Sequence, residues 1–280
     1  MGIPFLWPFV KKQGYIAGLL GRFPQDSRPP DGMILVDVLG SMYPTIRRTF
    51  LKNDSMTANI TFVRHLRSLQ LPQPTTVLYL DGPSPEEKRT TRDGREARRT
   101  MSLTKANTLL LEMEAILRDG RSIKKQHFRK LQKLINASFY LSNNLRMALA
   151  RYLEENGWTV VECPSEADIQ IALDCKAHDV VISGDSDSLI HPSIKTIWRP
   201  LARGGYLEYN VPQLLDKLEL SRTGLTVLGV VCKNDYTCNM KRMGLATNYE
   251  VIQSFQNDSR SQPCICFLSL LCLSSLSLFL

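Results

Sequence analysis

The sequence predicts an α/β fold with a central, mostly parallel sheet flanked by helices. Continuous runs of aliphatic and β-branched residues at 34–36, 77–80 and 180–182 are typical of strands buried on both faces. Stretches of helical periodicity separate these runs, as expected for parallel strands joined by crossover helices. Ligands of such sheets bind at the carboxyl ends of the strands, so we expect the acids that close or follow the runs to converge. These acids are Asp37, Asp81, Asp185 and Asp187.

The predicted elements follow from residue type and from helix and turn signals along the chain. The first part contains a strand at 33–37, a helix at about 57–69 and a strand at 76–81. A basic helical insert follows, with helices at 104–117 and 126–155, the second closed by the helix-stop residue Gly157. The third part contains strands at 158–163 and 179–183 around a helix at 165–177, short β segments near 196–198 and 206–208, and helices at 211–218 and 223–232.

Length, composition and charge limit the class of protein. The 280 residues, 43% of them hydrophobic, suffice for one large domain or for one domain with an appendage. The net charge of +8 and the pI near 9.2 favour a polyanionic partner, with nucleic acid as the first candidate. Seven cysteines without a C-x-x-C pair fit reduced thiols in a cell interior. No secretory leader is recognisable, so we expect a protein that is not secreted.

Most of the positive charge lies in the segment that contains the insert. Residues 82–133 carry 14 Lys and Arg against 7 Asp and Glu, so 14 − 7 gives +7 of the total of +8. A solvated helical face is the ordinary explanation of such a run. Because the segment directly follows Asp81, we favour a surface that binds phosphates beside a reactive site.

Four separated motifs carry a family resemblance. They are Met1-Gly2-Ile3-Pro4, Cys163-Pro164-Ser165-Glu166-Ala167-Asp168, Ser183-Gly184-Asp185-Ser186-Asp187-Ser188-Leu189 and Asp235-Tyr236. In order and spacing, the chain resembles the flap-endonuclease/XPG family of structure-specific 5′ nucleases over residues 1–250. The resemblance implies a PIN-like nuclease domain that uses two divalent metal ions to hydrolyse phosphodiester bonds in flapped or branched DNA. The basic helical insert would correspond to the family's arch or clamp.

The resemblance also implies a set of metal ligands. Paired Mg²⁺ ions stabilise the attacking and leaving oxygens of a phosphodiester, and carboxylates are their preferred ligands. The four histidines are scattered and form no zinc-binding spacing, so we expect Mg²⁺, with Mn²⁺ as a substitute. The expected ligands are Asp37, Asp81, Glu166, Asp168, Asp185, Asp187 and Asp235.

Basic residues complete the expected site. By position after Asp81, Lys88 and Arg95 match the family's catalytic cations, and their spacing of seven residues places both on one side of a helix. Gly94 weakens any helix there. The residues expected to bind nucleic acid are Gly2, Arg98, Arg99, Lys124, Lys125, Arg129 and Lys130.

The expected domain has four regions and a tail. Residues 1–100 form the N-terminal region, 101–157 the insert, 158–235 the internal region and 236–250 the start of a degenerate helix-two-turn-helix. Arg242 stands where the family's helix-two-turn-helix has a glycine, so the sequence does not establish that this segment binds duplex DNA. Residues 251–280 form an apolar tail, uncharged from 261 onward. A tail anchor has the right length, but we favour an artefactual gene end and expect no membrane association.

Two alternatives remain open. Taken singly, Ser165 is a helix cap and Asp185 a turn residue, so a catalytically silent nucleic-acid-binding protein with these acids retained for folding is one alternative. A PIN-like ribonuclease acting on RNA instead of DNA is the other. The complete set of seven acids argues against the silent alternative, and the resemblance implies DNA as the substrate and a nuclear location. No sliding-clamp motif is recognisable.

Overall fold

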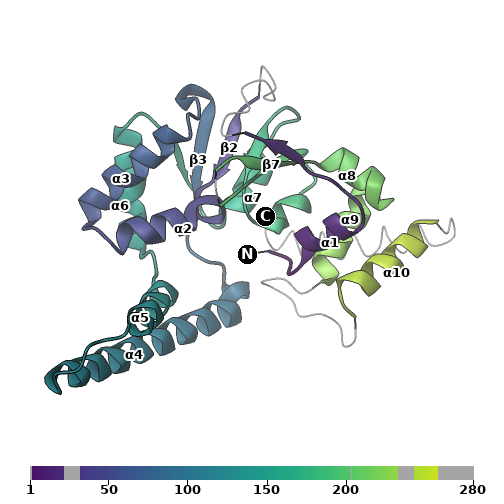
Figure 1. Ribbon diagram of the computed structural model, residues 1–280. Helices are drawn as coiled ribbons and strands as arrows, with labels where there is room; N and C mark the ends of the chain where they lie inside the picture. The colour runs from purple at the N-terminus through teal and green to yellow at the C-terminus, as the bar shows by residue number, and fades with distance from the viewer. Residues whose placement is uncertain (1, 22–31, 203, 233–242, 258–280) are drawn as a thin grey trace.

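A seven-stranded mixed sheet forms the centre of the molecule (Figure 1). The computed structural model describes residues 2–21, 32–202, 204–232 and 243–257. The strand order is β1-β7-β6-β5-β2-β3-β4, with parallel pairing from β6 to β4 and antiparallel pairing of β7 with β6 and β1. The strands are β1 (Gly18–Leu20), β2 (Ile34–Asp37), β3 (Thr76–Leu80), β4 (Thr159–Glu162), β5 (Val180–Ile182), β6 (Thr196–Pro200) and β7 (Tyr206–Asn210). The predicted fold class is confirmed.

The register of the central strands aligns their carboxyl ends. Ile34 of β2 pairs with Thr76 of β3 on one side and with Val180 of β5 on the other. The three strands therefore start level, and because they contain three to five residues, they end within two residues of one another. Their last residues lie at one edge of the sheet, from which the loops that carry the acids emerge.

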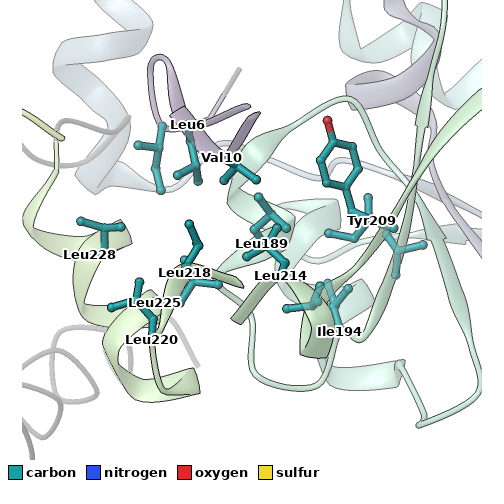
Figure 2. Packing of buried hydrophobic residues seen from close by; sticks show 14 of the residues in the cluster. Leu6, Val10, Leu189, Ile194, Tyr209, Leu214, Leu218, Leu220, Leu225 and Leu228 are labelled. Atoms are coloured by element: carbon teal, nitrogen blue, oxygen red, sulfur yellow. The ribbon is translucent and has the colours of Figure 1, made fainter. Parts of the chain in front are cut away.

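Two helical layers cover the two faces of the sheet (Figure 1). Alternate strand residues face opposite sides, so Leu35 and Val181 belong to one core cluster and Val36 and Ile182 to the other. The first cluster is completed by α1 (Leu6–Lys12), α7 (Ala167–Asp174), α8 (Val211–Leu218), α9 (Arg222–Val231) and α10 (Leu245–Asn257). Figure 2 shows part of this packing. The second is completed by α2 (Val38–Phe50), α3 (Ser55–Ser68) and α6 (Asn143–Glu155).

The insert is a helical hairpin that projects from the body of the protein (Figure 1). It consists of α4 (Arg89–Arg118) and α5 (Lys125–Ser138), which pack through Ala106, Leu109 and Met113 of α4. The helix predicted at 126–155 is wrong as a single element. Phe139 is extended, with φ −62° and ψ 135°, and the Ser142 side chain caps α6 by accepting from the Leu145 amide.

The helix α2 was not predicted from the sequence, although it begins at a candidate metal ligand. Asp37 is its N-cap, and the side chain accepts from the Gly40 amide at 2.7 Å. Gly40 and Pro44 interrupt the helical signal in this segment, but the buried positions Met42 and Ile46 hold it against the sheet. No helix among the described residues is long and apolar enough to cross a membrane. The apolar tail from 258 onward lies outside them.

Candidate active site

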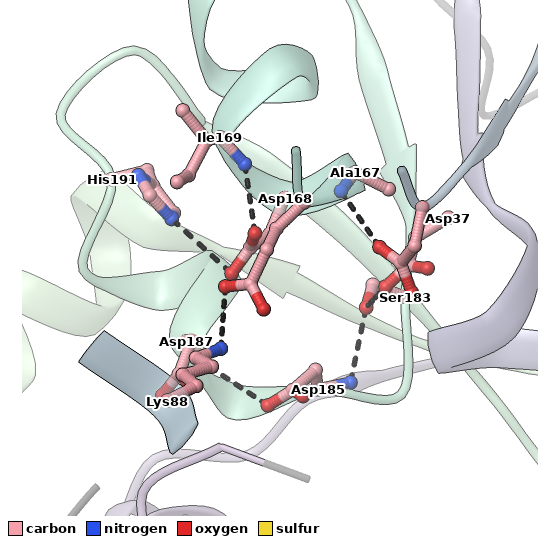
Figure 3. A network of polar contacts seen from close by, with 11 residues as sticks. Asp37, Lys88, Ala167, Asp168, Ile169, Ser183, Asp185, Asp187 and His191 are labelled. Atoms are coloured by element: carbon pink, nitrogen blue, oxygen red, sulfur yellow. Dashed lines mark hydrogen bonds and ion pairs between the residues drawn. The ribbon is translucent and has the colours of Figure 1, made fainter. Parts of the chain in front are cut away.

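Carboxylates from three strand ends and one helix gather at the edge where the parallel strands end (Figure 3). Asp37 ends β2 and Asp81 directly follows β3. Asp185 and Asp187 lie after β5, around the short 3-10 helix η4 (Ser186–Leu189). The Ser183 hydroxyl donates to Asp37 and accepts from the Asp185 amide, and the Asp187 amide donates to Asp185, so the segments after β2 and β5 meet here. The negative charge of Asp81 raises the pKa of Asp37, as expected for a neighbour at the same edge. The convergence predicted from strand position is therefore present for these four residues.

Asp37 is buried and held in place by two donors. Its side chain accepts from the Gly40 amide at 2.7 Å and from the Ser183 hydroxyl at 2.9 Å. Burial, followed by the negative charge of Asp81, raises the pKa of Asp37 to about 7 although both hydrogen bonds oppose the change. The folded protein therefore holds this carboxyl protonated at pH values where an exposed aspartate is charged.

Asp81 connects the end of β3 to the start of α7. Its Oδ1 accepts from the Ala167 amide at 2.8 Å. Burial raises the pKa of Asp81, and the charge of Asp168 adds to the effect, whereas the charges of Arg146 and Lys88 act in the opposite direction. The carboxyl thus lies between an acidic and a basic group of side chains.

Glu166 and Asp168 enter the cluster from the start of α7. Glu166 is paired with the ammonium group of Lys88, which is only 8% exposed. Asp168 accepts from its neighbouring Ile169 amide at 2.9 Å and lies 4.0 Å from Nε2 of His191. Burial would raise the pKa of Asp168, but the hydrogen bond and charge of His191, together with the charge of Lys88, outweigh burial and lower it.

Asp187 carries a buried oxygen without a hydrogen-bond partner in the described part of the chain, its Oδ1. Burial, then the charges of Asp185 and Asp168, raises the pKa of Asp187 to about 7. Its amide donates to Asp185 Oδ1 at 3.3 Å, which fixes the two acids on one tight turn. An unpartnered buried carboxylate oxygen is costly, so this atom is suited to a cation that the protein binds.

The N-terminal segment packs directly against the turn that carries Asp185. Gly2 has φ +57°, and a Cβ at this position would lie 2.0 Å from Asp185 Oδ1. Ser186 donates from its hydroxyl to the Ile3 carbonyl at 3.1 Å, and the Trp7 indole donates to the Gly184 carbonyl at 3.2 Å. Gly2 therefore lies beside the acid cluster, and only glycine fits there.

The expected basic residues lie at different places along the insert. Lys88 lies inside the acid cluster, and Arg95 is half-buried on α4. Arg98 donates to the Gly94 carbonyl at 2.9 Å, and the Arg99 guanidinium stacks 4.5 Å from the ring centroid of Tyr140. The other expected residues are exposed on the part of the insert farther along the hairpin, namely Lys124, Lys125, Arg129 and Lys130.

The donor set fits a hard divalent cation, although the ligands are not preassembled. All candidate donors are carboxylate oxygens, and Asp187 Oδ1 is buried without a hydrogen-bond partner among the described residues. Within the described ranges, no three His, Cys, Asp or Glu side chains already have the spacing of a metal site. The Lys88–Glu166 ion pair explains part of this result, since an ammonium group occupies one of the carboxylates. The expected ligand Asp235 lies outside the described residues.

Three residues at the site were not predicted from the sequence. Ser183 is fully buried and bonded to Asp37, His191 lies beside Asp168, and Arg146 donates to the Gly82 carbonyl at 3.2 Å. Ser183 opens the motif that contains Asp185 and Asp187, and this closeness in sequence could have indicated its place at the site. Arg146 is 64 positions from Gly82, and no local pattern could reveal that contact.

Comparisons with known proteins identify the fold. The catalytic core of Rad2 in complex with a DNA substrate superposes with a TM-score of 0.56 at 19% identity, over 91% of this chain and 70% of that one. Flap endonuclease-1 from Methanococcus jannaschii superposes with a TM-score of 0.56 at 16% identity, over 96% of this chain and 83% of that one. Human GEN1 in complex with Holliday junction DNA superposes with a TM-score of 0.52 at 15% identity, over 95% of this chain and 63% of that one. The chain has the flap-endonuclease/XPG fold. The resemblance predicted from the motifs is confirmed at this level.

Sequence comparisons agree with the flap-endonuclease/XPG fold but cover less of the chain. Flap endonuclease 1-A of Physcomitrium patens is 33% identical over 103 residues, which are 35% of this chain and 26% of the relative. Flap endonuclease 1-B of the same organism is 28% identical over 188 residues, which are 63% of this chain and 49% of the relative. No protein-family profile matches the chain. The chain thus spans at most about half the length of these curated relatives.

Gly82, directly after Asp81, is expected to be indispensable for the shape of the site. A Cβ there would lie 2.0 Å from the Cys163 carbonyl oxygen, against backbone that cannot move without shifting α7. We expect Gly82→Ala to destabilise the protein by roughly 1–3 kcal/mol, as overpacking does. Gly94→Ala is the matched control, because its Cβ would meet nothing within 4 Å on the exposed helix α4.

Gly94→Ala should raise the free energy of unfolding by about 0.5–1 kcal/mol, the difference between glycine and alanine in a helix. Urea denaturation of both variants measures the two effects. Equal stability of the two variants would contradict the packing of Gly82 against the α7 segment.

Proposed function

We propose that the protein is a metal-dependent, structure-specific 5′ nuclease that hydrolyses phosphodiester bonds in flapped or branched DNA. The observation that carries the proposal is the acid cluster itself. Six carboxylates from separate parts of the chain meet at the carboxyl edge of a flap-endonuclease/XPG fold, and burial and mutual repulsion raise the pKa values of Asp37 and Asp187 to about 7. Two proteins of this fold are described as complexes with DNA, Rad2 with a DNA substrate and human GEN1 with Holliday junction DNA.

The acids are suited to hold two Mg²⁺ ions, or Mn²⁺ in their place. When bound, such ions neutralise charge on the attacking and leaving oxygens and lower the pKa of water. The residues that would hold them are Asp37, Asp81, Glu166, Asp168, Asp185 and Asp187, with Asp235 as a proposed seventh. Ser183 and the Gly40 amide orient Asp37, and the Ala167 amide orients Asp81.

Lys88 and Arg95 would act on the phosphate. The ammonium group of Lys88 already lies among the carboxylates as the counterion of Glu166, so a phosphate bound there would meet a buried positive charge. Buried and preoriented cations stabilise developing negative charge more strongly than solvated ones. Arg95 lies two helical turns farther along α4, in the direction of the hairpin.

The basic hairpin would bind the DNA backbone outside the cleavage site. Its exposed cations include Arg98, Lys124, Lys125, Arg129 and Lys130. Neutralising several phosphates makes affinity strongly dependent on salt, so DNA binding should weaken steeply between low and physiological salt. A nuclear location follows if the protein acts on chromosomal DNA.

Cleavage of a labelled 5′-flap substrate tests the proposal. We expect cutting near the junction with Mg²⁺ or Mn²⁺ and none with EDTA, and slower cutting of a blunt duplex of the same sequence. Binding without cleavage under every metal condition would favour the silent nucleic-acid-binding alternative. Faster cutting of the RNA version of the flap than of the DNA version would favour the ribonuclease.

A further inference from the structure

Arg146 joins the two ends of the helical insert beside the acid cluster. It lies half-buried in the first turn of α6, directly after the insert. Its Nη1 donates to the Gly82 carbonyl at 3.2 Å, and Gly82 is the residue between Asp81 and the insert. Its Nη2 donates to Asn143 Oδ1 at 2.5 Å, on its own helix. The guanidinium therefore reaches from the end of the insert back to its beginning.

Two cations flank Asp81, one from each side of the insert. Lys88 comes from the short 3-10 helix η3 (Glu86–Lys88) before α4, and Arg146 comes from α6 after α5. Lys88 is paired with the carboxylate of Glu166. The hydrogen bonds of Arg146 described above go to a carbonyl oxygen and an amide oxygen, both neutral acceptors. Because the Gly82 carbonyl that accepts from Arg146 belongs to the residue directly after Asp81, the positive charge of Arg146 lies next to the acid cluster.

We propose that Arg146 contacts phosphate in the cleavage site and forms the cationic side of that site together with Lys88. The inference rests on the proposed function and adds a residue to it. A guanidinium has five N–H donors, and the hydrogen bonds to Gly82 and Asn143 engage only one donor on each terminal nitrogen. Guanidinium groups bind phosphate through paired hydrogen bonds, which are stronger than bonds to neutral oxygens.

The substitutions Arg146→Gln and Arg146→Lys separate charge from positioning. Glutamine is polar but shorter and removes the charge, whereas lysine retains the charge without the planar guanidinium. Arg151→Gln is the matched control, since Arg151 is exposed on the same helix and the change in net charge is identical. The single-turnover rate on saturating 5′-flap DNA and the affinity for Mn²⁺ without DNA are measured for each protein.

We expect Arg146→Gln to slow the bound-state rate roughly 100- to 1,000-fold, as the loss of one preorganised donor does. Arg146→Lys should recover part of that rate, because it keeps the charge but not the paired hydrogen bonds, and Arg151→Gln should match the parent. Arg146→Gln should bind Mn²⁺ about threefold more tightly, because a like charge has been removed from beside the ligands. If Arg146 only held the Gly82 backbone in place, Arg146→Gln would displace Asp81 and weaken Mn²⁺ binding instead.

Two outcomes would overturn the inference. One is a parental rate in Arg146→Gln. The other is an equal loss of rate in the glutamine and lysine variants together with weaker Mn²⁺ binding. If the parent cuts no flap DNA, the proposed function fails, and Mn²⁺ binding alone decides on Arg146. Tighter binding by Arg146→Gln then supports a cation acting on the acid cluster, whereas unchanged or weaker binding overturns it.

Discussion

Asp187→Asn should abolish cleavage of flap DNA while leaving DNA binding intact. The buried Oδ1 of Asp187 has no hydrogen-bond partner in the described part of the chain, so the isosteric amide breaks no contact at that atom. It does remove one negative charge from the proposed metal ligands. Metal ions supply several kcal/mol of charge stabilisation in such reactions, which corresponds to a loss of about 10³-fold in rate. Single-turnover cleavage and equilibrium binding of one labelled flap measure the two quantities.

Asp216→Asn provides the matched control for this experiment. Asp216 is exposed on α8, away from the acid cluster, and undergoes the same chemical change. We expect its cleavage rate and DNA affinity to equal those of the parent. DNA affinity of Asp187→Asn should be unchanged or slightly higher, since a negative charge facing phosphate is removed. Parental cleavage by Asp187→Asn would exclude this carboxylate as a metal ligand.

The strands and the acids that follow them were predictable because their signals are local. The runs at 34–36, 77–80 and 180–182 are apolar on both faces, and only a sheet covered by two helical layers buries both. Once these runs are parallel, their carboxyl ends must share one edge. The positions of Asp37 and Asp81 then follow from counting along the chain.

Helix boundaries were less predictable because single residues decide them. The apolar residues Phe139 and Leu141 continue the helical pattern of α5, yet Phe139 is extended and Ser142 starts a new helix. The hydroxyl of Ser142 satisfies the Leu145 amide, which makes the break favourable, but serine also occurs within helices. At Gly40 and Pro44 the error was opposite, since tertiary packing formed a helix that local propensity opposes.

The contacts within the site could not be predicted from the sequence. The Lys88–Glu166 pair joins residues 78 positions apart, and the Arg146–Gly82 bond joins residues 64 apart. Both depend on how the insert returns to the sheet, which no local pattern encodes. The motifs identified which acids gather, whereas the fold determines which of their oxygens have partners.

The metal-free protein should become less stable as pH rises from about 4 to about 7, and divalent metal should reverse this loss. Asp37 and Asp187 have folded-state pKa values of about 7, above the ordinary aspartate value of 3.8. Between these values the folded state binds more protons than the unfolded state, so stability falls with rising pH. The penalty is absent below about pH 4 and complete above about pH 7. A shift of three units corresponds to roughly 4 kcal/mol for one carboxyl.

The double variant Asp37→Asn/Asp187→Asn isolates these two groups from the other titrating residues. Its free energy of unfolding in EDTA should exceed that of the parent by at least about 2 kcal/mol at pH 7.5, and the difference should shrink toward pH 4. Millimolar Mg²⁺ should stabilise the parent, because it binds the folded cluster and not the unfolded chain, and should stabilise the variant much less.

Urea denaturation at pH 4, 5.5 and 7.5, with and without Mg²⁺, measures all of these effects. Parallel pH profiles for the two proteins, with equal responses to Mg²⁺, would mean that Asp37 and Asp187 do not belong to one cluster of buried, mutually repelling carboxylates. The proposed two-metal chemistry would then lose its physical basis, because the same crowding of buried negative charge that destabilises the metal-free fold is what would bind the ions.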